Sequence, residues 1–227
     1  MAGQSTDQKV HFLIAGTQKG GTTALAAYLA RHPEVFIPPA KEVHFFDNDN
    51  LDWLDPDWSV YHQHFNSALN EQIWGEATPI TMWWKPAIER LWRYNPHIRV
   101  IIILRNPITR AFSHWNMERQ RGAESLEFFQ ALSQEPMRCR TALPLQHRVY
   151  SYMDRGFYVA QLREIWRFFP RHQVMVIRQE WLADAPEQTL ADIERFLGLS
   201  PCPFAGELKV HQRSYDNPMP EAAFELL

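Results

Sequence analysis

Apolar runs alternate with segments of helical periodicity along the chain, a pattern typical of an α/β protein. Continuous apolar runs predict strands, which we place at 12–15, 35–37, 73–78, 99–104 and 173–178. Apolar residues spaced three and four apart predict helices, which we place at 22–32, 86–94, 108–121, 126–133, 158–169 and 186–197. Because strands and helices alternate, we expect a mainly parallel sheet flanked by helices. The 227 residues fit a single domain with a large core.

Prolines and one glycine mark the expected helix ends. Pro33, Pro96 and Pro170 each follow an apolar-periodic segment, and Gly198 closes the last one. Because Pro136 follows the segment 126–133, we expect that helix to end there and an irregular stretch to follow. The aromatic-rich segment 48–68 is expected to form a surface loop and a short helix that pack their rings inward.

A glycine-rich loop follows the first predicted strand. The sequence VHFLIAGTQKGGTT, residues 10–23, contains an apolar run, then Gly16, Gly20 and Gly21, then two threonines that open a predicted helix. In such an arrangement, backbone N–H groups and the positive end of the helix dipole converge on an anion, and glycine lets the backbone approach it closely. The pattern predicts a phosphate-binding loop; a turn that merely connects strand and helix is the alternative.

The loop does not follow the order found in Walker-type nucleotide-binding proteins. That order requires Gly-Lys followed directly by Ser or Thr, whereas Lys19 precedes the glycine pair. The strongest predicted strand ends in Arg105, where a Walker-type enzyme would place a magnesium-binding Asp. Because ligands lie beyond the carboxyl ends of parallel strands, we expect the Arg105 guanidinium at the same sheet edge as the loop, where it can bind a phosphate through two parallel hydrogen bonds. Ser113, eight residues later, lies beside it if its helix turns back over the strand end.

Titratable and aromatic residues interleave in the segment KEVHFFD, residues 41–47. The segment has no clean period, which favours a loop at a functional site over a core element. Glu42 and His44 are its candidate proton-transfer groups. A solvated carboxylate and a hydrogen-bonded structural histidine are the alternative interpretations.

Composition narrows the classes of function. The chain has 45% hydrophobic and 22% charged residues, as globular proteins do, and its formal net charge of -3 argues against a general nucleic-acid binder. The first residues lack the apolar stretch of a signal peptide and no window has the length of a membrane span, so we expect a soluble, cytoplasmic protein. Cys139 and Cys202 lie far apart without a CxxC spacing, so we expect reduced structural thiols and no zinc site.

Taken together, these segments resemble the sulfotransferases that use 3′-phosphoadenosine 5′-phosphosulfate (PAPS). FLIAGTQKGGTTAL is similar to their 5′-phosphosulfate loop, and VIIILRNPITRAFSHW is similar to their 3′-phosphate motif, with Arg105 and Ser113 at the matching positions. KEVHFFD is similar to the segment that carries the base in heparan sulfate 3-O-type enzymes, and FYVAQLREIWRFFPRHQVMVIRQEWL also fits the family pattern. The resemblance covers most of the chain in the correct order. It implies a P-loop-like, three-layer α/β fold in one domain over residues 1–227.

The resemblance also implies a reaction: sulfuryl transfer from PAPS to a hydroxyl or, less favoured, an amine, without a metal ion, leaving adenosine 3′,5′-bisphosphate (PAP). The implied donor-binding residues are Thr17, Gln18, Lys19, Gly20, Gly21, Thr22, Thr23, Arg105 and Ser113. Lys19 would neutralise charge on the bridging oxygen and Glu42 would be the base, with His44 and Glu76 in reserve. Glu76, Arg155 and Tyr158 are candidate acceptor contacts; for Arg155 and Tyr158, a helix-start ion pair and a core aromatic are equal alternatives.

Two departures from the family pattern affect the acceptor and the donor site. Heparan sulfate enzymes carry Lys where this chain has Ala77, which weakens the expectation of a heparan-like acceptor. Their basic C-terminal loop corresponds to LKVHQRSYDNP, so Arg213, and in second place His211, is expected at the 3′-phosphate. We expect a bacterial enzyme with a small-molecule, carbohydrate or carrier-bound acceptor and no nucleic-acid or membrane partner; the oligomeric state stays open. A P-loop kinase and a non-catalytic nucleotide-binding module are the alternative functions.

Overall fold

The computed structural model of the chain describes residues 8–69, 72–203 and 219. Its centre is a parallel sheet of five strands in the order β2-β3-β1-β4-β5. The strands are β1 (Phe12–Gly16), β2 (Val35–Phe36), β3 (Ile73–Glu76), β4 (Arg99–Leu104) and β5 (Val174–Arg178). All strands point the same way, so their carboxyl ends, and the loops that follow them, share one edge of the sheet.

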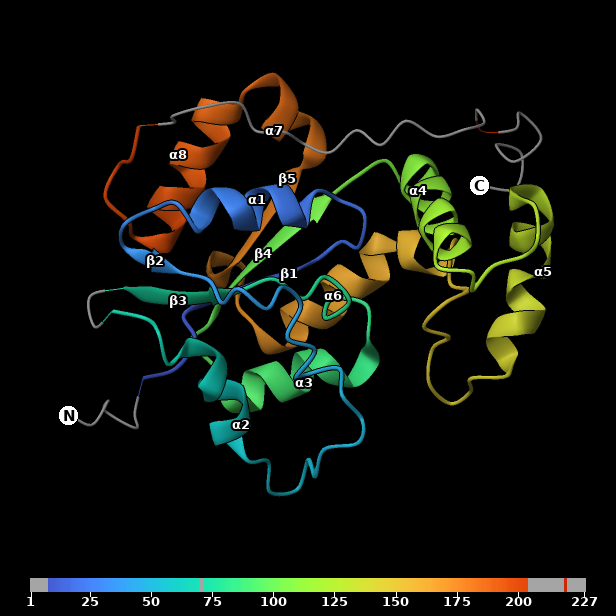
Figure 1. The fold of residues 1–227 in the computed structure, drawn as a ribbon, viewed down its shortest axis with the longest axis horizontal. Helices are drawn as coiled ribbons and strands as arrows, with labels where there is room; N and C mark the ends of the chain where they lie inside the picture. The colour runs from blue at the N-terminus through green and yellow to red at the C-terminus, as the bar shows by residue number, and fades with distance from the viewer. Residues whose placement is uncertain (1–7, 70–71, 204–218, 220–227) are drawn as a thin grey trace.

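Helices cover both faces of the sheet (Figure 1). One face carries α1 (Thr22–Leu29), α7 (Gln179–Asp184) and α8 (Pro186–Leu197), and the other carries α2 (Trp58–His62), α3 (Lys85–Tyr94) and α6 (Tyr158–Phe168). Side chains alternate along β1: Phe12 and Ile14 join the core beneath α1 and α8, whereas Leu13 and Ala15 join the core beneath α3 and α6. The three-layer α/β fold that the sequence predicts is confirmed.

Two further helices lie beyond the carboxyl end of β4 (Figure 1). They are α4 (Pro107–Gln120) and α5 (Phe128–Arg140), which share a small core with Tyr152. Short 3₁₀ helices complete the described part of the chain: η1 (Gln63–Phe65), η2 (Asp154–Gly156) and η3 (Arg171–Gln173). The placement of α4 matters for the site, because it follows β4 directly at the sheet edge.

Helix α5 corrects the sequence expectation. It was expected over 126–133 with an irregular stretch around Pro136, but it begins at Phe128 and continues through Pro136 to Arg140. Proline removes the N–H that would bond to the carbonyl of Leu132, and its ring crowds that carbonyl. The buried face formed by Phe128, Ala131 and Leu132 holds the preceding turns, because tertiary packing supplies most helical stability.

Smaller differences concern element ends. Helix α1 ends at Leu29 instead of residue 32, and α7 was not predicted because six residues are too few to show a helical period. Within the described residues, no helix has both the length and the apolar character needed to cross a membrane. Cys139 and Cys202 are both free thiols.

Candidate functional site

The glycine-rich loop packs directly against β4. The backbone N–H of Thr17 donates to the carbonyl of Ile103 at 2.9 Å, and Gly20 donates to the carbonyl of Thr17 at 2.8 Å. A Cβ atom on Gly20 would lie 2.6 Å from the carbonyl oxygen of Ile103, so this contact requires glycine. Gly21 has a φ of 104° and caps the N-terminus of α1. The loop therefore presents the amino end of α1 at the carboxyl edge of the sheet.

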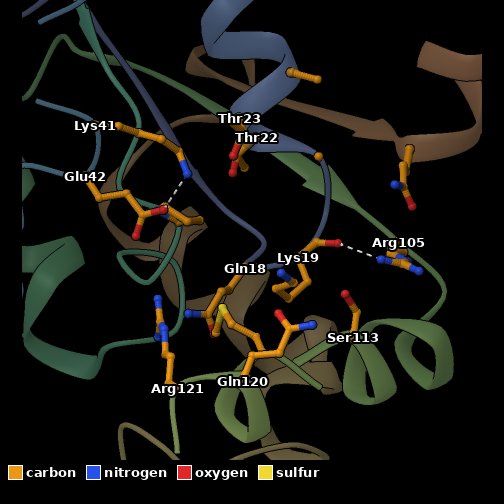
Figure 2. Close-up of a pocket in the computed structure, with 15 residues that line it drawn as sticks. Gln18, Lys19, Thr22, Thr23, Lys41, Glu42, Arg105, Ser113, Gln120 and Arg121 are labelled. Carbon is orange, nitrogen blue, oxygen red and sulfur yellow. Dashed lines mark hydrogen bonds and ion pairs between the residues drawn. The ribbon is translucent and has the colours of Figure 1, made fainter. Parts of the chain in front are cut away.

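A cavity of about 520 Å³ opens at this edge (Figure 2). Figure 2 shows Lys41 and Glu42 on one side of the loop and Arg105 and Ser113 on the other. The residues that line the cavity are Gln18, Lys19, Gly21, Thr22, Thr23, Ala24, Lys41, Glu42, Pro79, Arg105, Ser113, Met117, Gln120, Arg121 and Gln179. Most of the predicted anion-binding residues thus share one cavity.

Arg105 and the loop are in direct contact. The Arg105 guanidinium donates from Nη1 to the carbonyl of Lys19 at 3.1 Å and from Nε to the hydroxyl of Thr109 at 3.0 Å. Asn106 caps α4, since its side chain accepts from the backbone N–H of Ile108 at 3.0 Å. The helix therefore starts immediately after the strand, and Ser113 comes to line the same cavity as Arg105.

Glu42 carries the one carboxylate among the described residues that line the cavity, and two cations contact it. Lys41 Nζ lies 2.8 Å from Glu42 Oε1, and His44 Nε2 lies 3.4 Å from Glu42 Oε2. Burial opposes ionisation of Glu42, but the hydrogen bonds from His44 and Lys41 outweigh it and lower its pKa to about 2. The group is therefore a carboxylate at neutral pH.

His44 is held in turn by a buried aspartate. Its Nδ1 lies 3.0 and 3.1 Å from the two carboxylate oxygens of Asp47, whose side chain is 2% exposed. Hydrogen bonds to Asp47 and Glu42 raise the pKa of His44 to about 9. Arg148 Nη1 donates to Asp47 at 2.7 Å, so an alternating chain of charges runs from Glu42 to Arg148. The chain fixes the orientation of His44 against Glu42.

Three residues of the site have an unusual, left-handed backbone conformation. Lys19, Glu42 and His44 have φ values of 69°, 61° and 55°, and they are the non-glycine residues with positive φ in the described chain. This region is sparsely populated by L-residues, at a cost on the order of 1–3 kcal/mol each, and such residues gather at functional sites. The same three residues were assigned to catalysis from the sequence, so an independent property singles them out.

The comparison with known families decides what kind of site this is. The model of the sulfotransferase domain matches residues 9–219. This chain belongs to the sulfotransferase family. The family resemblance inferred from the sequence motifs is thereby confirmed.

Individual sulfotransferases agree with this assignment. Heparan sulfate glucosamine 3-O-sulfotransferase 5 of Mus musculus is 28% identical over 212 residues, which cover 88% of this chain and 59% of the mouse protein. A sulfotransferase structure from Alicyclobacillus acidocaldarius is 29% identical, with a TM-score of 0.81 over 96% of this chain and 89% of that one. The structure of mouse SULT7A1 complexed with PAP, 18% identical over 86% of this chain and 60% of that one, has a TM-score of 0.54 and shares the fold. The chain spans about three-fifths of the mouse 3-O-sulfotransferase.

Some predicted site residues of this sulfotransferase-family chain do not line the cavity. Glu76, a reserve base and candidate substrate contact, is 1% exposed and does not line the cavity. It accepts hydrogen bonds from Tyr61 at 2.8 Å, from the backbone of Val43 at 3.3 Å and from Thr78. Burial raises its pKa. Glu76 therefore stabilises the segment that contains Glu42, through its hydrogen bond to the backbone of Val43.

Arg155 and Tyr158, the candidate acceptor contacts, also lie off the cavity surface. Arg155 is 2% exposed, and its guanidinium donates to Gln18 Oε1 and, at 2.7 Å, to the carbonyl of Arg148. Tyr158 donates its hydroxyl to the carbonyl of Arg105 at 2.8 Å. Both residues hold cavity-lining residues or their neighbours in place, and neither lines this cavity, so a direct contact with the acceptor stays a prediction.

The remaining predicted residues divide into two groups. Thr17 and Gly20 shape the loop through their backbone atoms and do not line the cavity. Arg213 and His211 lie outside the described residues.

Sequence reasoning missed several residues of the site. Lys41 precedes Glu42 within the KEVHFFD motif, and that position was the available signal. Arg121 lies at the end of the predicted helix that carries Ser113. Helical periodicity predicts that helix but does not mark Arg121 as a residue of the site. Arg148 reaches Asp47 from 101 residues away, and no local pattern marks it.

Proposed function

We propose that this sulfotransferase moves a sulfuryl group from PAPS to a hydroxyl group of an acceptor and releases PAP; an amine is the less favoured acceptor group. The contact between Arg105 and the loop carries the proposal, because it places a guanidinium 3.1 Å from the carbonyl of Lys19. PAPS carries anionic groups at both the 5′ and 3′ positions of one ribose. A single molecule can therefore reach the amino end of α1 and Arg105 together.

The residues at the donor end fit such a ligand. Backbone N–H groups of the loop and the dipole of α1 favour an anion at the position of the phosphosulfate. The Arg105 guanidinium bonds to two neutral oxygens, so its positive charge is available to a 3′-phosphate, with the Ser113 hydroxyl as a further donor. ATP lacks a 3′-phosphate, so these two residues select for PAPS and PAP.

Lys19 and Glu42 act on the two bonds that change. In the proposed reaction, the acceptor oxygen bonds to sulfur, the bond between sulfur and the bridging oxygen breaks, and the acceptor proton passes to Glu42. Lys19 neutralises the negative charge that develops on the bridging oxygen. A carboxylate with a pKa of about 2 is a weak base. It suffices because the acceptor hydroxyl becomes strongly acidic as its oxygen bonds to sulfur.

Two measurements test the proposal. Calorimetry should show that PAP binds more tightly than AMP or magnesium-ATP, and labelled PAPS should pass its sulfuryl group to a hydroxylated acceptor in an acceptor screen. Tight binding of magnesium-ATP without a response to PAP would instead favour the kinase alternative. PAP binding with no transfer to any acceptor, and no loss of label from PAPS, would favour a non-catalytic nucleotide-binding module.

A further inference from the structure

A second cavity lies beside His44, the residue that contacts the proposed base Glu42. It has a volume of about 520 Å³ and is lined by Val43, His44, Asp47, Asn48, Asp49, Asn50 and Arg148. His44 contacts Glu42 at 3.4 Å, and Glu42 lines the first cavity. The linings of the two cavities are therefore in contact through Glu42 and His44.

The lining of this second cavity is mostly polar. Carboxylates accept hydrogen bonds, the two asparagine amides both donate and accept, and the Arg148 guanidinium donates. A hydroxyl group is both a donor and an acceptor, so it can pair with any of these groups. Val43 is the apolar member of the lining. Such a surface suits a molecule with several hydroxyl groups better than an apolar one.

Cations between the two cavities are already paired with carboxylates of the chain. Lys41 lies 2.8 Å from Glu42, and His44 lies 3.4 Å from Glu42 and 3.0 Å from Asp47. Each of these positive charges is therefore compensated before any acceptor arrives. An anionic acceptor would have to compete with these carboxylates for them.

The cations farther out are compensated in the same way. Arg148 lies 2.7 Å from Asp47 and 3.5 Å from Asp49, and Arg90 lies 2.8 Å from Asp49. Arg121, which lines the first cavity, lies 3.0 Å from Glu118.

Arg105 at the donor end differs from these cations. Its guanidinium bonds to the carbonyl of Lys19 and the hydroxyl of Thr109, and no carboxylate of the described residues lies within ion-pairing distance of it. Uncompensated positive charge is thus found where the PAPS phosphates are proposed to bind. It is not found in the lining of the second cavity, where His44 and Arg148 both have carboxylate partners.

We infer that the second cavity is the acceptor site and that its acceptor is an uncharged, polyhydroxylated molecule such as a neutral saccharide. The inference rests on the proposed sulfuryl transfer and adds the class of acceptor. The reaction is the one proposed above: the acceptor hydroxyl loses its proton to Glu42 as its oxygen bonds to sulfur, and PAP departs. This class differs from the sulfated glycan in the name of the mouse relative.

The first test compares neutral and anionic probes on the full chain loaded with PAP. Maltotriose, cellotriose and laminaritriose serve as neutral probes, and trigalacturonic acid and a heparan sulfate oligosaccharide serve as anionic probes of similar length. Saturation-transfer NMR should detect at least one neutral probe at millimolar concentration, with binding independent of salt. The inference is overturned if the anionic probes bind more tightly, with affinity falling as salt rises, or if every neutral probe fails to bind.

A matched pair of variants tests the position of the site. Asp49→Asn removes one compensating charge from the cavity lining and should raise the affinity for trigalacturonic acid about three- to tenfold at low salt. Asp55→Asn makes the same change at an exposed aspartate that does not line the cavity, and it should have no such effect. If the two variants had the same affinity for trigalacturonic acid, the assignment of the second cavity as the acceptor site would be wrong. PAP affinity, measured in parallel, reports separately on the proposed donor site.

Discussion

The buried guanidinium of Arg155 donates a hydrogen bond to the side-chain oxygen of Gln18 and thereby orients the Gln18 amide. Arginine has only donors, so the amide end that contacts it must be Oε1, and Nε2 is the end left for the cavity that Gln18 lines. The same guanidinium donates to the carbonyl of Arg148, whose side chain holds Asp47. Arg155 therefore links the glycine-rich loop to the charged chain that ends at Glu42.

We expect Arg155→Lys to lower kcat about ten- to a hundredfold while PAP affinity changes little, since small misplacements of reacting groups have effects of this size. A lysine keeps the charge, but its single ammonium cannot span Gln18 and the Arg148 carbonyl as a guanidinium does. Steady-state kinetics and PAP calorimetry measure the two effects. Arg163→Lys, at an exposed position on α6, is the matched control. An unchanged kcat, or equal losses of kcat and PAP affinity, would contradict this role.

Lys19→Ala should reduce kcat about 10²- to 10³-fold and PAP affinity much less, because Lys19 acts on charge that develops only during transfer. Single-turnover transfer from labelled PAPS measures the chemical step directly. Lys85→Ala removes an exposed lysine at the start of α3 and should leave both quantities unchanged. If Lys19→Ala weakened PAP binding as much as it slowed transfer, Lys19 would be a binding residue only.

Arg105→Ala should weaken PAP binding about ten- to a hundredfold and leave AMP binding nearly unchanged, because only PAP has the 3′-phosphate. Calorimetry with both nucleotides on wild type and variant gives the comparison, and AMP serves as the internal control for folding of the loop. Equal losses for PAP and AMP would mean that Arg105 acts by supporting the loop through its bond to Lys19.

The pair of Glu42 and His44 should make stability depend on pH in a defined window. The pKa of His44 is raised from 6.5 to about 9, so its contribution is fully present below pH 6.5 and is lost as pH rises through about 9. The pKa of Glu42 is lowered from 4.5 to about 2, so its contribution is present above pH 4.5 and is lost as pH falls through about 2. His44→Gln should therefore lower Tm most between pH 4.5 and 6.5 and least above pH 9. A Tm difference that is constant with pH would contradict the pairing.

The sequence was sufficient for features that are local or that parallel strands bring together. Strands that run the same way end at the same edge, so the loop after β1 and Arg105 after β4 were expected to meet, and they do. The segment with Glu42 and His44 was recognised from its mixture of titratable and aromatic residues.

Other features depend on distant packing that no local pattern contains. Glu76 was predicted to be a reserve base. The end of β3 is buried on both faces, however, so its carboxylate points into the protein. The burial of Arg155 depends on α4, η2 and the loop packing together, which the sequence does not specify position by position. The opposite error occurred at Pro136, where packing overrode a local helix-ending signal.

Glu42→Gln tests the base directly and should lower kcat at every pH between 5 and 9, since a neutral amide cannot take the acceptor proton. The expected loss is about 10²- to 10⁴-fold, the usual contribution of a positioned base. The amide keeps the shape of the side chain and can still accept a hydrogen bond from Lys41, so PAP affinity should stay close to wild type. Glu89→Gln, at a half-exposed glutamate of α3 paired with Arg93, is the control for loss of one surface carboxylate. If Glu42→Gln retained wild-type kcat while PAP bound normally, the proton would have to leave by another group. His44 could not serve below about pH 9 while its ring is protonated, so solvent water would have to take the proton.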